Sequence, residues 1–347
     1  MRVIPVNSLS LKFAGALLGA IALAGTFAPA QAQSAKSVEI MNVSYDIGRE
    51  LFIKINEAFA ADWLKKKNQT VAISQSHAGT GAQARSILEG LPADVVTFNQ
   101  VIDVQVLADK GKLIPTDWQK RLPNASSPYY SLPAFLVRKG NPKNVKDWDD
   151  LARDGVKAVF PNPKTSGNAR YTYLAAYAFG LDKFKGDHAK TQDFVKKLLS
   201  NVPVFDTGGR ASTTTFVDRN IGDVLITFEA EVNAAKKEYG DKGFEIVIPS
   251  QSLLAEFLVA VIDKNVDRKG TREVATAYLE YLYTEEAQEI IAGFANRVQN
   301  PKVLERHRAD YPAVKLVTVE DVFGGWGKAN KEHFGEGGIL DKVFVKR

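Results

Sequence analysis

An alternation of strand-like and helix-like segments constrains the fold of this chain more than any other feature. Short runs rich in β-branched or apolar residues predict buried strands at 38–44, 71–76 and 94–98. Between them, 47–64 and 101–110 carry apolar residues at helical spacing. Such βαβ patterning indicates an α/β fold with a mainly parallel sheet and helices on both faces.

A second block of the chain repeats this pattern. The pattern predicts strands at 157–160, 202–205 and 223–228, with helices at 168–179 and 210–218. The apolar segments 134–137 and 223–228 bracket the block, so they are where the chain would pass between two lobes.

Two lobes with separate cores are therefore expected, since 347 residues suffice for both. We assign 33–135 and 228–300 to a discontinuous lobe 1 and 136–227 to lobe 2. Within lobe 1, 274–294 is expected as one amphipathic helix. Residues 301–347 are expected to be an irregular C-terminal segment that wraps the outside.

Residues 1–32 have the pattern of a secretory leader. Arg2 and Lys12 supply its sparse positive charge, and 13–25 is an apolar run too short to span a bilayer. The Ala-Gln-Ala triplet at 30–32 fits the signal-peptidase pattern, so we expect cleavage after it and a periplasmic location. The alternative is a membrane anchor, which is less favoured because no stop-transfer charges follow. The leader lacks a twin-arginine pair, which predicts general export of the unfolded chain.

The composition narrows the classes of function. Removal of the leader's two positive charges lowers the formal net charge from +5 to +3, and opposite charges are interspersed, so no nucleic-acid-binding stripe is expected. The absence of cysteine excludes disulfides, thiolate metal sites and thiol nucleophiles. The four histidines are scattered, and neither a G-x-S-x-G elbow nor a phosphate-binding P-loop occurs. We therefore expect no catalysis, no metal and no cofactor.

Four strand–loop–helix junctions share one composition, with small or hydroxyl residues at the point where a helix opens. A helix N-terminus presents unpaired N–H groups and a positive dipole end, which suit a small anion. Loops at the carboxyl ends of strands in an α/β sheet meet where ligands bind, and two junctions come from each block. The four junctions are Ser44-Tyr45-Asp46-Ile47-Gly48, Ser76-His77-Ala78-Gly79-Thr80-Gly81, Pro163-Lys164-Thr165-Ser166-Gly167-Asn168 and Asp206-Thr207-Gly208-Gly209-Arg210.

Each junction alone has a simpler interpretation. Ser166 or Thr80 is more often just a helix N-cap, and Gly209 just a turn residue. Asp46 carries a carboxylate that would repel an anion, so only its backbone N–H would serve. The four junctions together favour an anion site in a cleft between the lobes.

One junction also imitates a dinucleotide-binding fingerprint. Gly79, Gly81 and Ala84 have the spacing of that fingerprint, and Asp103 follows at about the right distance. The fingerprint would follow the second strand rather than the first. Export in an unfolded state also disfavours a cofactor, so we do not expect one here.

The sequence at these junctions resembles the periplasmic sulfate/thiosulfate-binding proteins of ATP-binding-cassette importers. The resemblance runs from about residue 38 to about residue 340. It implies a two-lobed periplasmic binding protein fold (type II) with the ligand in the interlobe cleft. The matching segments are Asn42-Val43-Ser44-Tyr45-Asp46, Gln75-Ser76-His77-Ala78-Gly79, Ala93-Asp94-Val95-Val96-Thr97, Phe135-Leu136-Val137-Arg138-Lys139-Gly140-Asn141-Pro142, Pro161-Asn162-Pro163-Lys164-Thr165-Ser166-Gly167 and Val322-Phe323-Gly324-Gly325-Trp326.

The resemblance also implies the ligand-binding groups. In the sulfate-binding branch the dianion is held by backbone N–H groups and a few hydroxyl or indole donors. That branch has a tryptophan donor after the strand at which this chain has Phe228, and this departure is more similar to the thiosulfate-binding branch. The implied donors here are the N–H of Asp46, the Thr80 hydroxyl, the hydroxyl and N–H of Ser166, and the N–H groups of Gly167, Asn168 and Gly209.

These patterns together predict a receptor that captures sulfate or thiosulfate and delivers it to the membrane permease subunits of an importer. We expect it to act as a monomer. A receptor for another oxyanion, phosphate or molybdate, remains the main alternative because it would share the fold and the donor loops. A secreted hydrolase is a more distant alternative, since the chain offers no nucleophile or metal cluster.

Overall fold

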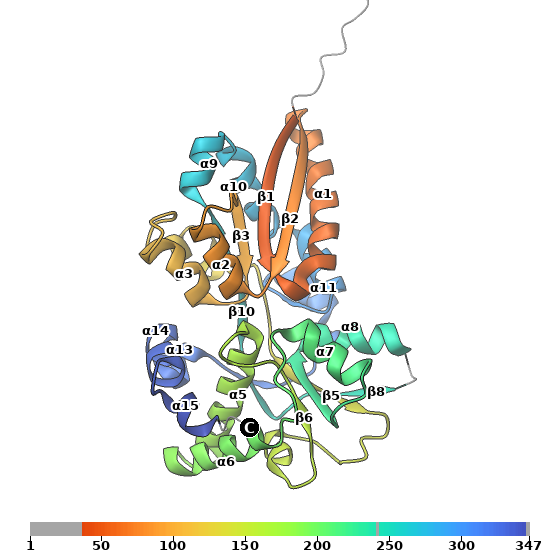
Figure 1. Ribbon diagram of the computed structural model, residues 1–347. Helices are drawn as coiled ribbons and strands as arrows, with labels where there is room; N and C mark the ends of the chain where they lie inside the picture. Colours follow the sequence, from red (N-terminus) through yellow and green to blue (C-terminus); the bar gives the residue numbers. More distant parts are fainter. Residues whose placement is uncertain (1–36, 241–242, 345–347) are drawn as a thin grey trace, which may run out of the picture. The chain divides into compact units, whose positions relative to one another are not determined.

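Two β-sheets organise the chain (Figure 1). The structure is a computed structural model that describes residues 37–240 and 243–344, and the predicted leader lies outside the described residues. Within these ranges no helix is long and apolar enough to span a bilayer. The mixed α/β architecture agrees with the predicted fold class.

The first sheet has six strands in the order β11-β4-β10-β3-β1-β2. Its β1, β2 and β3 are parallel, as their sequences predict, whereas β10 runs antiparallel to β3 and β4. The strands are β1 (Ser37–Tyr45), β2 (Thr70–Ala78), β3 (Val95–Phe98), β4 (Tyr129–Ser131), β10 (Ala255–Val261) and β11 (Arg297–Val298).

Helices cover both faces of this sheet because its central strands are apolar on both sides. Ile40 of β1 belongs to the cluster that contains the buried face of α1, while Val43 belongs to the cluster of α2 and α3. Figure 1 shows α1 on one side of β1 and β2, and α2 and α3 on the other. The helices of this region are α1 (Arg49–Lys67), α2 (Thr80–Leu88), α3 (Val101–Asp109), α4 (Pro123–Ser126), α9 (Asp263–Lys269), α10 (Arg272–Tyr281) and α11 (Glu285–Gly293).

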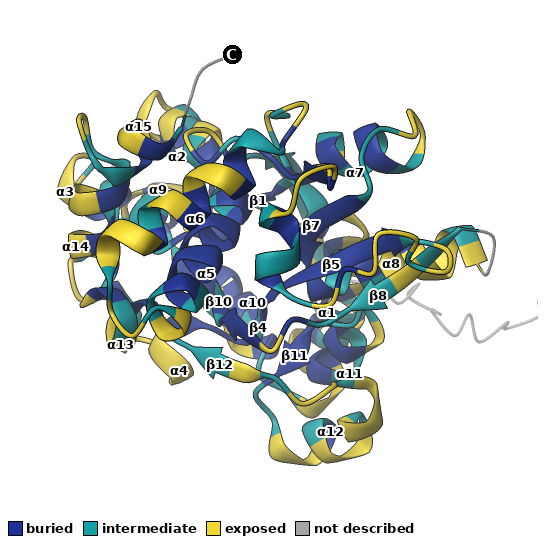
Figure 2. Cartoon of the chain, turned by 90° about the horizontal axis from the view of Figure 1, so that it is seen from below, coloured by how far each residue is buried: buried dark blue, intermediate teal, exposed yellow. Residues whose placement is uncertain are grey.

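The second sheet has four strands in the order β6-β7-β5-β8. Phe135 of β5 contributes to the core cluster of α5, whereas Leu136 contributes to the cluster of α7 and α8. In Figure 2, buried residues are concentrated along α5, β5 and β7. The elements are β5 (Pro133–Arg138), β6 (Ala158–Val159), β7 (Val224–Phe228), β8 (Phe244–Val247), α5 (Gly167–Lys183), α6 (His188–Ser200), α7 (Gly209–Val217) and α8 (Glu229–Tyr239).

The chain crosses between the sheets at short connections. Only Leu132 separates β4 of the first sheet from β5 of the second. The chain returns to the first sheet later than the predicted boundary at 228, because β8 still pairs with β5 in the second sheet. Phe244 of β8 also packs on Phe216 of α7, which fixes this strand to the second core. The return to the first sheet is instead made at β10.

Two predictions of secondary structure were wrong. Residues 202–205 form no strand, although Val202 is buried, because this segment joins no ladder. The helix expected over 274–294 is two helices, α10 and α11, since the Thr284 side chain caps a new helix by accepting from the Ala287 N–H.

The C-terminal segment 301–347 is ordered in its described part rather than irregular. Trp326 packs edge-on against Tyr171 of α5, and His333 hydrogen-bonds to Tyr173 of the same helix. These buried aromatic contacts fix the segment to the second sheet's main helix. Its elements are α12 (Pro301–Arg306), α13 (Val319–Phe323), α14 (Trp326–Ala329), a π-helical turn (Asn330–Phe334), α15 (Ile339–Val343) and β12 (Lys315–Val317), which pairs with β9 (Gln251–Leu253).

Candidate functional site

The four predicted junctions lie close together. A methyl group on Gly167 would lie 2.7 Å from Asn99 Oδ1, and one on Gly79 would lie 3.8 Å from the Thr165 carbonyl oxygen. A methyl group on Gly208 would lie 2.8 Å from Asp46 Oδ2. Loops that follow β1, β2 and β3 therefore face the N-termini of α5 and α7.

The N-cap residues of the helices at this point make no side-chain capping hydrogen bond, although the Asp46 carboxylate accepts from the Arg210 N–H in the first turn of α7. Gly79, Ser166 and Gly208 occupy the N-cap positions of α2, α5 and α7, and none of these helices has a side-chain capping hydrogen bond. The first N–H groups of a helix have no partner within it. Three helices thus direct donor groups and positive dipole ends toward one region.

Ser166 and Asn168 are both buried at the start of α5, with side chains 6% and 3% exposed. Although Ser166 occupies the N-cap position, its hydroxyl does not cap the helix. Its hydroxyl and the N–H groups of Gly167 and Asn168 therefore form one local set of donors. This arrangement differs from the ordinary capping role that Ser166 alone would suggest.

Thr80 opens α2, and its side chain is only 2% exposed. Its hydroxyl donates to Asp103 Oδ2 at 2.6 Å and lies 3.2 Å from Asn99 Oδ1. Burial raises the pKa of Asp103, while the bond from Thr80 and the charge of Arg170 oppose this shift. The Thr80 hydroxyl, a predicted donor to the ligand, therefore already donates to a carboxylate of the protein. It would have to give up this bond to Asp103 before it could donate to a ligand.

Asp46 lies at the end of β1 and approaches α7. Its Oδ1 accepts the Ile47 N–H at 3.1 Å, and its carboxylate also interacts with the backbone N–H of Arg210. Burial raises the pKa of Asp46, and these two backbone bonds oppose the shift. The Asp46 carboxylate, which the sequence analysis identified as a group that would repel an anion, lies beside the α7 N-terminus.

Glu231 is a residue that the sequence analysis missed. It belongs to the first turn of α8, and its Oε2 would lie 3.3 Å from a methyl group on Gly209. Thr213 donates to its Oε1 at 2.7 Å, and Thr227 donates to its Oε2. The signal available in the sequence was weak, because a glutamate on a helix normally indicates a solvated face.

Phe228 is fully buried at the end of β7. Its ring packs edge-on against Phe257 and Tyr171, with centroids 5.4 and 6.0 Å away. It belongs to an aromatic cluster and lines a cavity of about 440 Å³ that also contains Tyr45.

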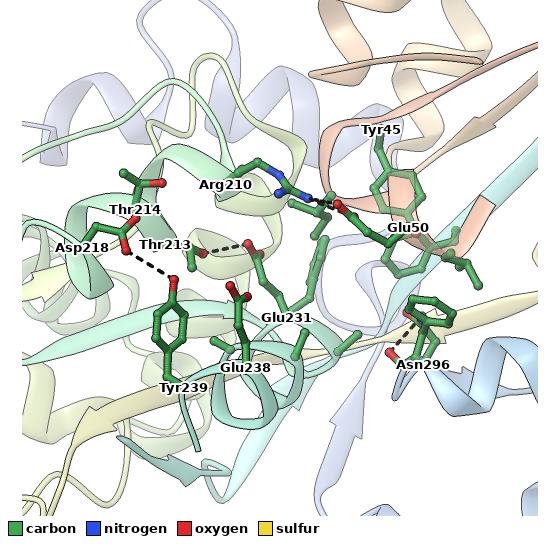
Figure 3. A pocket seen from close by; sticks show the side chains of 18 residues that line it. Tyr45, Glu50, Arg210, Thr213, Thr214, Asp218, Glu231, Glu238, Tyr239 and Asn296 are labelled. Carbon is green, nitrogen blue, oxygen red and sulfur yellow. Dashed lines mark hydrogen bonds and ion pairs between the residues drawn. The ribbon is translucent and has the colours of Figure 1, made fainter. Parts of the chain in front are cut away.

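The cavity lies beside the junctions and carries several charged groups (Figure 3). Glu50 of α1 accepts two hydrogen bonds from Arg210 of α7, at 3.0 and 3.1 Å. Glu231 points into the same region. The pair between Glu50 and Arg210 joins an element of the first sheet to an element of the second.

The chemistry of this arrangement is that of binding through donors. Within the described ranges, no group of three or more His, Asp or Glu is placed to hold a metal ion. The donors are backbone N–H groups and the Ser166 hydroxyl, on helices that converge. Such a set is complementary to a small, fully ionised anion that offers only acceptors.

Comparisons with known proteins identify the family of the chain. The family model described as "Bacterial extracellular solute-binding protein" matches residues 50–294. The chain is 55% identical to the thiosulfate-binding protein of Escherichia coli (strain K12) over 89% of this chain and 92% of the relative. It is 50% identical to the sulfate-binding protein of the same strain over 89% of this chain and 94% of the relative.

A solved structure gives the same result for the fold. The sulfate-binding protein SubI from Mycobacterium tuberculosis H37Rv superposes with a TM-score of 0.77 at 31% sequence identity. The match covers 86% of this chain and all of SubI. The two-sheet architecture is thus shared over nearly the whole described chain.

Proposed function

Because the chain belongs to the family of bacterial extracellular solute-binding proteins, we propose that it is the sulfate- and thiosulfate-binding component of an ATP-binding-cassette importer. Its role is to capture the dianion and deliver it, without chemical conversion. We place the ligand among Asp46, Thr80, Ser166, Gly167, Asn168 and Gly209.

The observation that carries this proposal is the convergence of three helix N-termini. Ser166, Gly208 and Gly79 open α5, α7 and α2 without a capping hydrogen bond from their own side chains. A dianion loses a large hydration energy on burial, so it needs many donors at once. Backbone N–H groups on several helices supply these donors without a cationic side chain.

The preference between the two anions is proposed to depend on Phe228. Thiosulfate replaces one oxygen of sulfate with a larger and weakly accepting sulfur. An apolar ring suits this sulfur better than it suits an oxygen, which requires a donor. Support comes from the position of Phe228 in the aromatic cluster with Tyr171 of α5, the helix that Ser166 opens.

The cellular context is proposed on the same basis. The leader pattern at 1–32 supports export to the periplasm and cleavage after the Ala-Gln-Ala triplet. Closure of the two lobes around the anion would create the surface that membrane permease subunits recognise. We propose that the receptor acts as a monomer.

A calorimetric panel tests the function. The mature protein is titrated with sulfate, thiosulfate, phosphate and molybdate at one pH and ionic strength. We expect micromolar or tighter binding of sulfate and thiosulfate, equivalent to at least about 8 kcal/mol, with thiosulfate at least as tight. Tight binding of phosphate or molybdate alone contradicts the assigned ligand, and a strong preference for sulfate contradicts the role of Phe228.

A further inference from the structure

A chain of hydrogen bonds leads from Glu231 to the proposed anion site. Asn168 Nδ2 donates to Thr227 Oγ1 at 2.8 Å, and the Thr227 hydroxyl donates in turn to Glu231 Oε2. Thr227 is fully buried at the end of β7. The Thr227 hydroxyl thus connects the Glu231 carboxylate to the side-chain amide of Asn168, a residue that we assign to ligand binding.

The far end of this chain is unsatisfied. Asn168 Oδ1 is buried and has no hydrogen-bond partner among the residues that the structure describes. An unmatched buried polar atom costs about 1–3 kcal/mol, so a ligand or a rearrangement should satisfy it. A sulfate or thiosulfate dianion cannot do so with the amide in this orientation, because both the anion and Oδ1 are acceptors.

Reversal of the hydrogen bonds between Glu231, Thr227 and Asn168 resolves this conflict. If Glu231 is protonated, its O–H can donate to Thr227, and the Thr227 hydroxyl can then donate to Asn168. The Asn168 amide must turn by about 180° to place Oδ1 toward Thr227, and its N–H groups then take the position of the orphaned oxygen. The site gains a donor, and the neighbouring carboxylate loses its negative charge.

We propose that Glu231 is a positioning residue that takes up a proton when the dianion binds and thereby turns the Asn168 amide into a donor. The inference rests on the proposed function of this site. The proton comes from solvent and resides on Glu231 in the complex, and no covalent bond other than this O–H forms or breaks. Binding of the dianion and protonation of Glu231 therefore favour each other.

The surroundings of Glu231 are consistent with this role. Burial raises the pKa of Glu231 and the charge of Asp46 adds to the shift, while the bonds from Thr227 and Thr213 and the charge of Arg210 oppose it. The titratable and charged groups that face this region are Asp46, Glu50, Arg210, Asp218, Glu238, Tyr239 and Tyr45.

Proton uptake is measured by calorimetry of the mature protein with thiosulfate and with sulfate. The titrations are repeated from about pH 6 to about pH 9 in buffers of different ionisation enthalpy that carry no sulfonate group. We expect uptake of up to about one proton on binding. In the pH range where this uptake changes, the affinity should fall by up to about tenfold for each unit by which the pH rises. If the anion binds but no proton is exchanged at any pH, the proposed protonation of Glu231 is wrong, while the proposed function remains intact.

Three variants locate the proton. In Glu231→Gln the amide nitrogen can donate to Thr227 permanently, so we expect pH-independent binding without proton uptake. Thr227→Val should abolish the uptake because it interrupts the chain. Glu238→Gln, a carboxylate of α8 that lines the same cavity, should retain the uptake of the original protein.

Two results overturn the assignment. One is proton uptake that persists in Glu231→Gln, and in particular uptake that Asp46→Asn abolishes instead. The other is failure of either anion to bind at any pH, which overturns the proposed site together with the protonation of Glu231. The measurement on the original protein needs no variant, so poor folding of one variant leaves the proposal testable.

Discussion

The guanidinium of Arg297 donates two hydrogen bonds to the carboxylate of Glu229, at 2.7 and 2.9 Å. Glu229 begins α8 directly after β7, while Arg297 lies in β11 of the first sheet. Both side chains are buried, and Arg297 also donates to the Pro312 carbonyl. This ion pair therefore joins the two sheets beside the crossing strands.

Breaking this pair should strongly destabilise the protein. Glu229→Gln leaves a buried guanidinium without its counter-charge, which typically costs about 3–5 kcal/mol. The free energy of unfolding from urea titration measures the loss. Glu285→Gln is the control, because Glu285 pairs with Arg306 at an exposed position, where we expect a loss under about 1 kcal/mol. Equal losses in both variants would show that the buried pair has no special role.

Ser166→Ala should weaken anion binding without affecting the fold. The change removes one donor to a buried charge, which is worth about 1.5–3 kcal/mol, or about a tenfold to a hundredfold increase in Kd. Calorimetry with thiosulfate measures the effect, and Ser86→Ala, at a half-buried position of α2 outside the assigned site, is the control. Unchanged affinity in Ser166→Ala would argue against the assigned site.

Gly167→Ala should oppose lobe closure, because the added methyl group would lie 2.7 Å from Asn99 Oδ1 across the site. Overlap of this kind costs about 1–3 kcal/mol, so affinity should fall by about fivefold to a hundredfold. Gly79→Ala is the matched control, since its methyl group would meet the Thr165 carbonyl at 3.8 Å, an ordinary contact. Similar losses in both variants would contradict a closed arrangement of these loops.

Glu50→Gln should have a small, salt-sensitive effect on affinity. Glu50 and Arg210 are both more than half exposed, so their pair is worth at most about 1 kcal/mol and Kd should rise less than about fivefold. The difference should disappear in about 0.5 M NaCl. Glu57→Gln removes a pair with Lys54 within α1 and serves as the control. An effect that persists at high salt would point to a role other than the ion pair.

Stability should fall in acid because of His333. Burial lowers the pKa of His333 to about 4, and the charge of His188 adds to this. As the pH falls, His333 is therefore protonated in the unfolded chain before it is protonated in the folded protein. The contribution of neutral His333 to stability is complete above about pH 6.5 and is lost as the pH falls toward 4. The loss should reach about 3 kcal/mol.

Urea unfolding between about pH 4 and 7 measures this slope. His333→Leu should remove most of it, whereas His307→Gln should retain it. Hydrogen bonds that the His307 ring donates to Glu289 and Asp310 raise the pKa of His307, so the contribution of His307 to stability changes only at higher pH. An unchanged slope in His333→Leu would assign the acid sensitivity to other groups.

Sequence reasoning found the elements whose signals are local. The strands β1, β2 and β3 were predicted because apolar and β-branched residues favour strands, even in β2 at the edge of the sheet, which has no fully buried residue. The segment 202–205 has the same composition, but its backbone finds no neighbouring strand. Strand pairing depends on distant partners, which explains both this error and the late return of the chain at β10.

The proposed site was predictable in part for the same reason. Ser166 and Gly209 stand at helix N-termini, which leave a signature in the sequence. Glu231 has no such signature, since its position depends on how α8 packs beside α7. The hydrogen-bond partners of Thr80 and Asn168 could not be predicted from the sequence either, because hydrogen bonds between side chains depend on tertiary structure.

The strand order of the first sheet affects how the chain can fold. Its β3 hydrogen-bonds to β10, and all four strands of the second sheet lie between these two strands in sequence. The N-terminal half therefore cannot complete its sheet until β10 has been synthesised. Contacts so distant in sequence slow folding, because the loop must close before the pairing is gained. A nascent chain of this topology should therefore complete its first sheet only after about three quarters of its length has been synthesised.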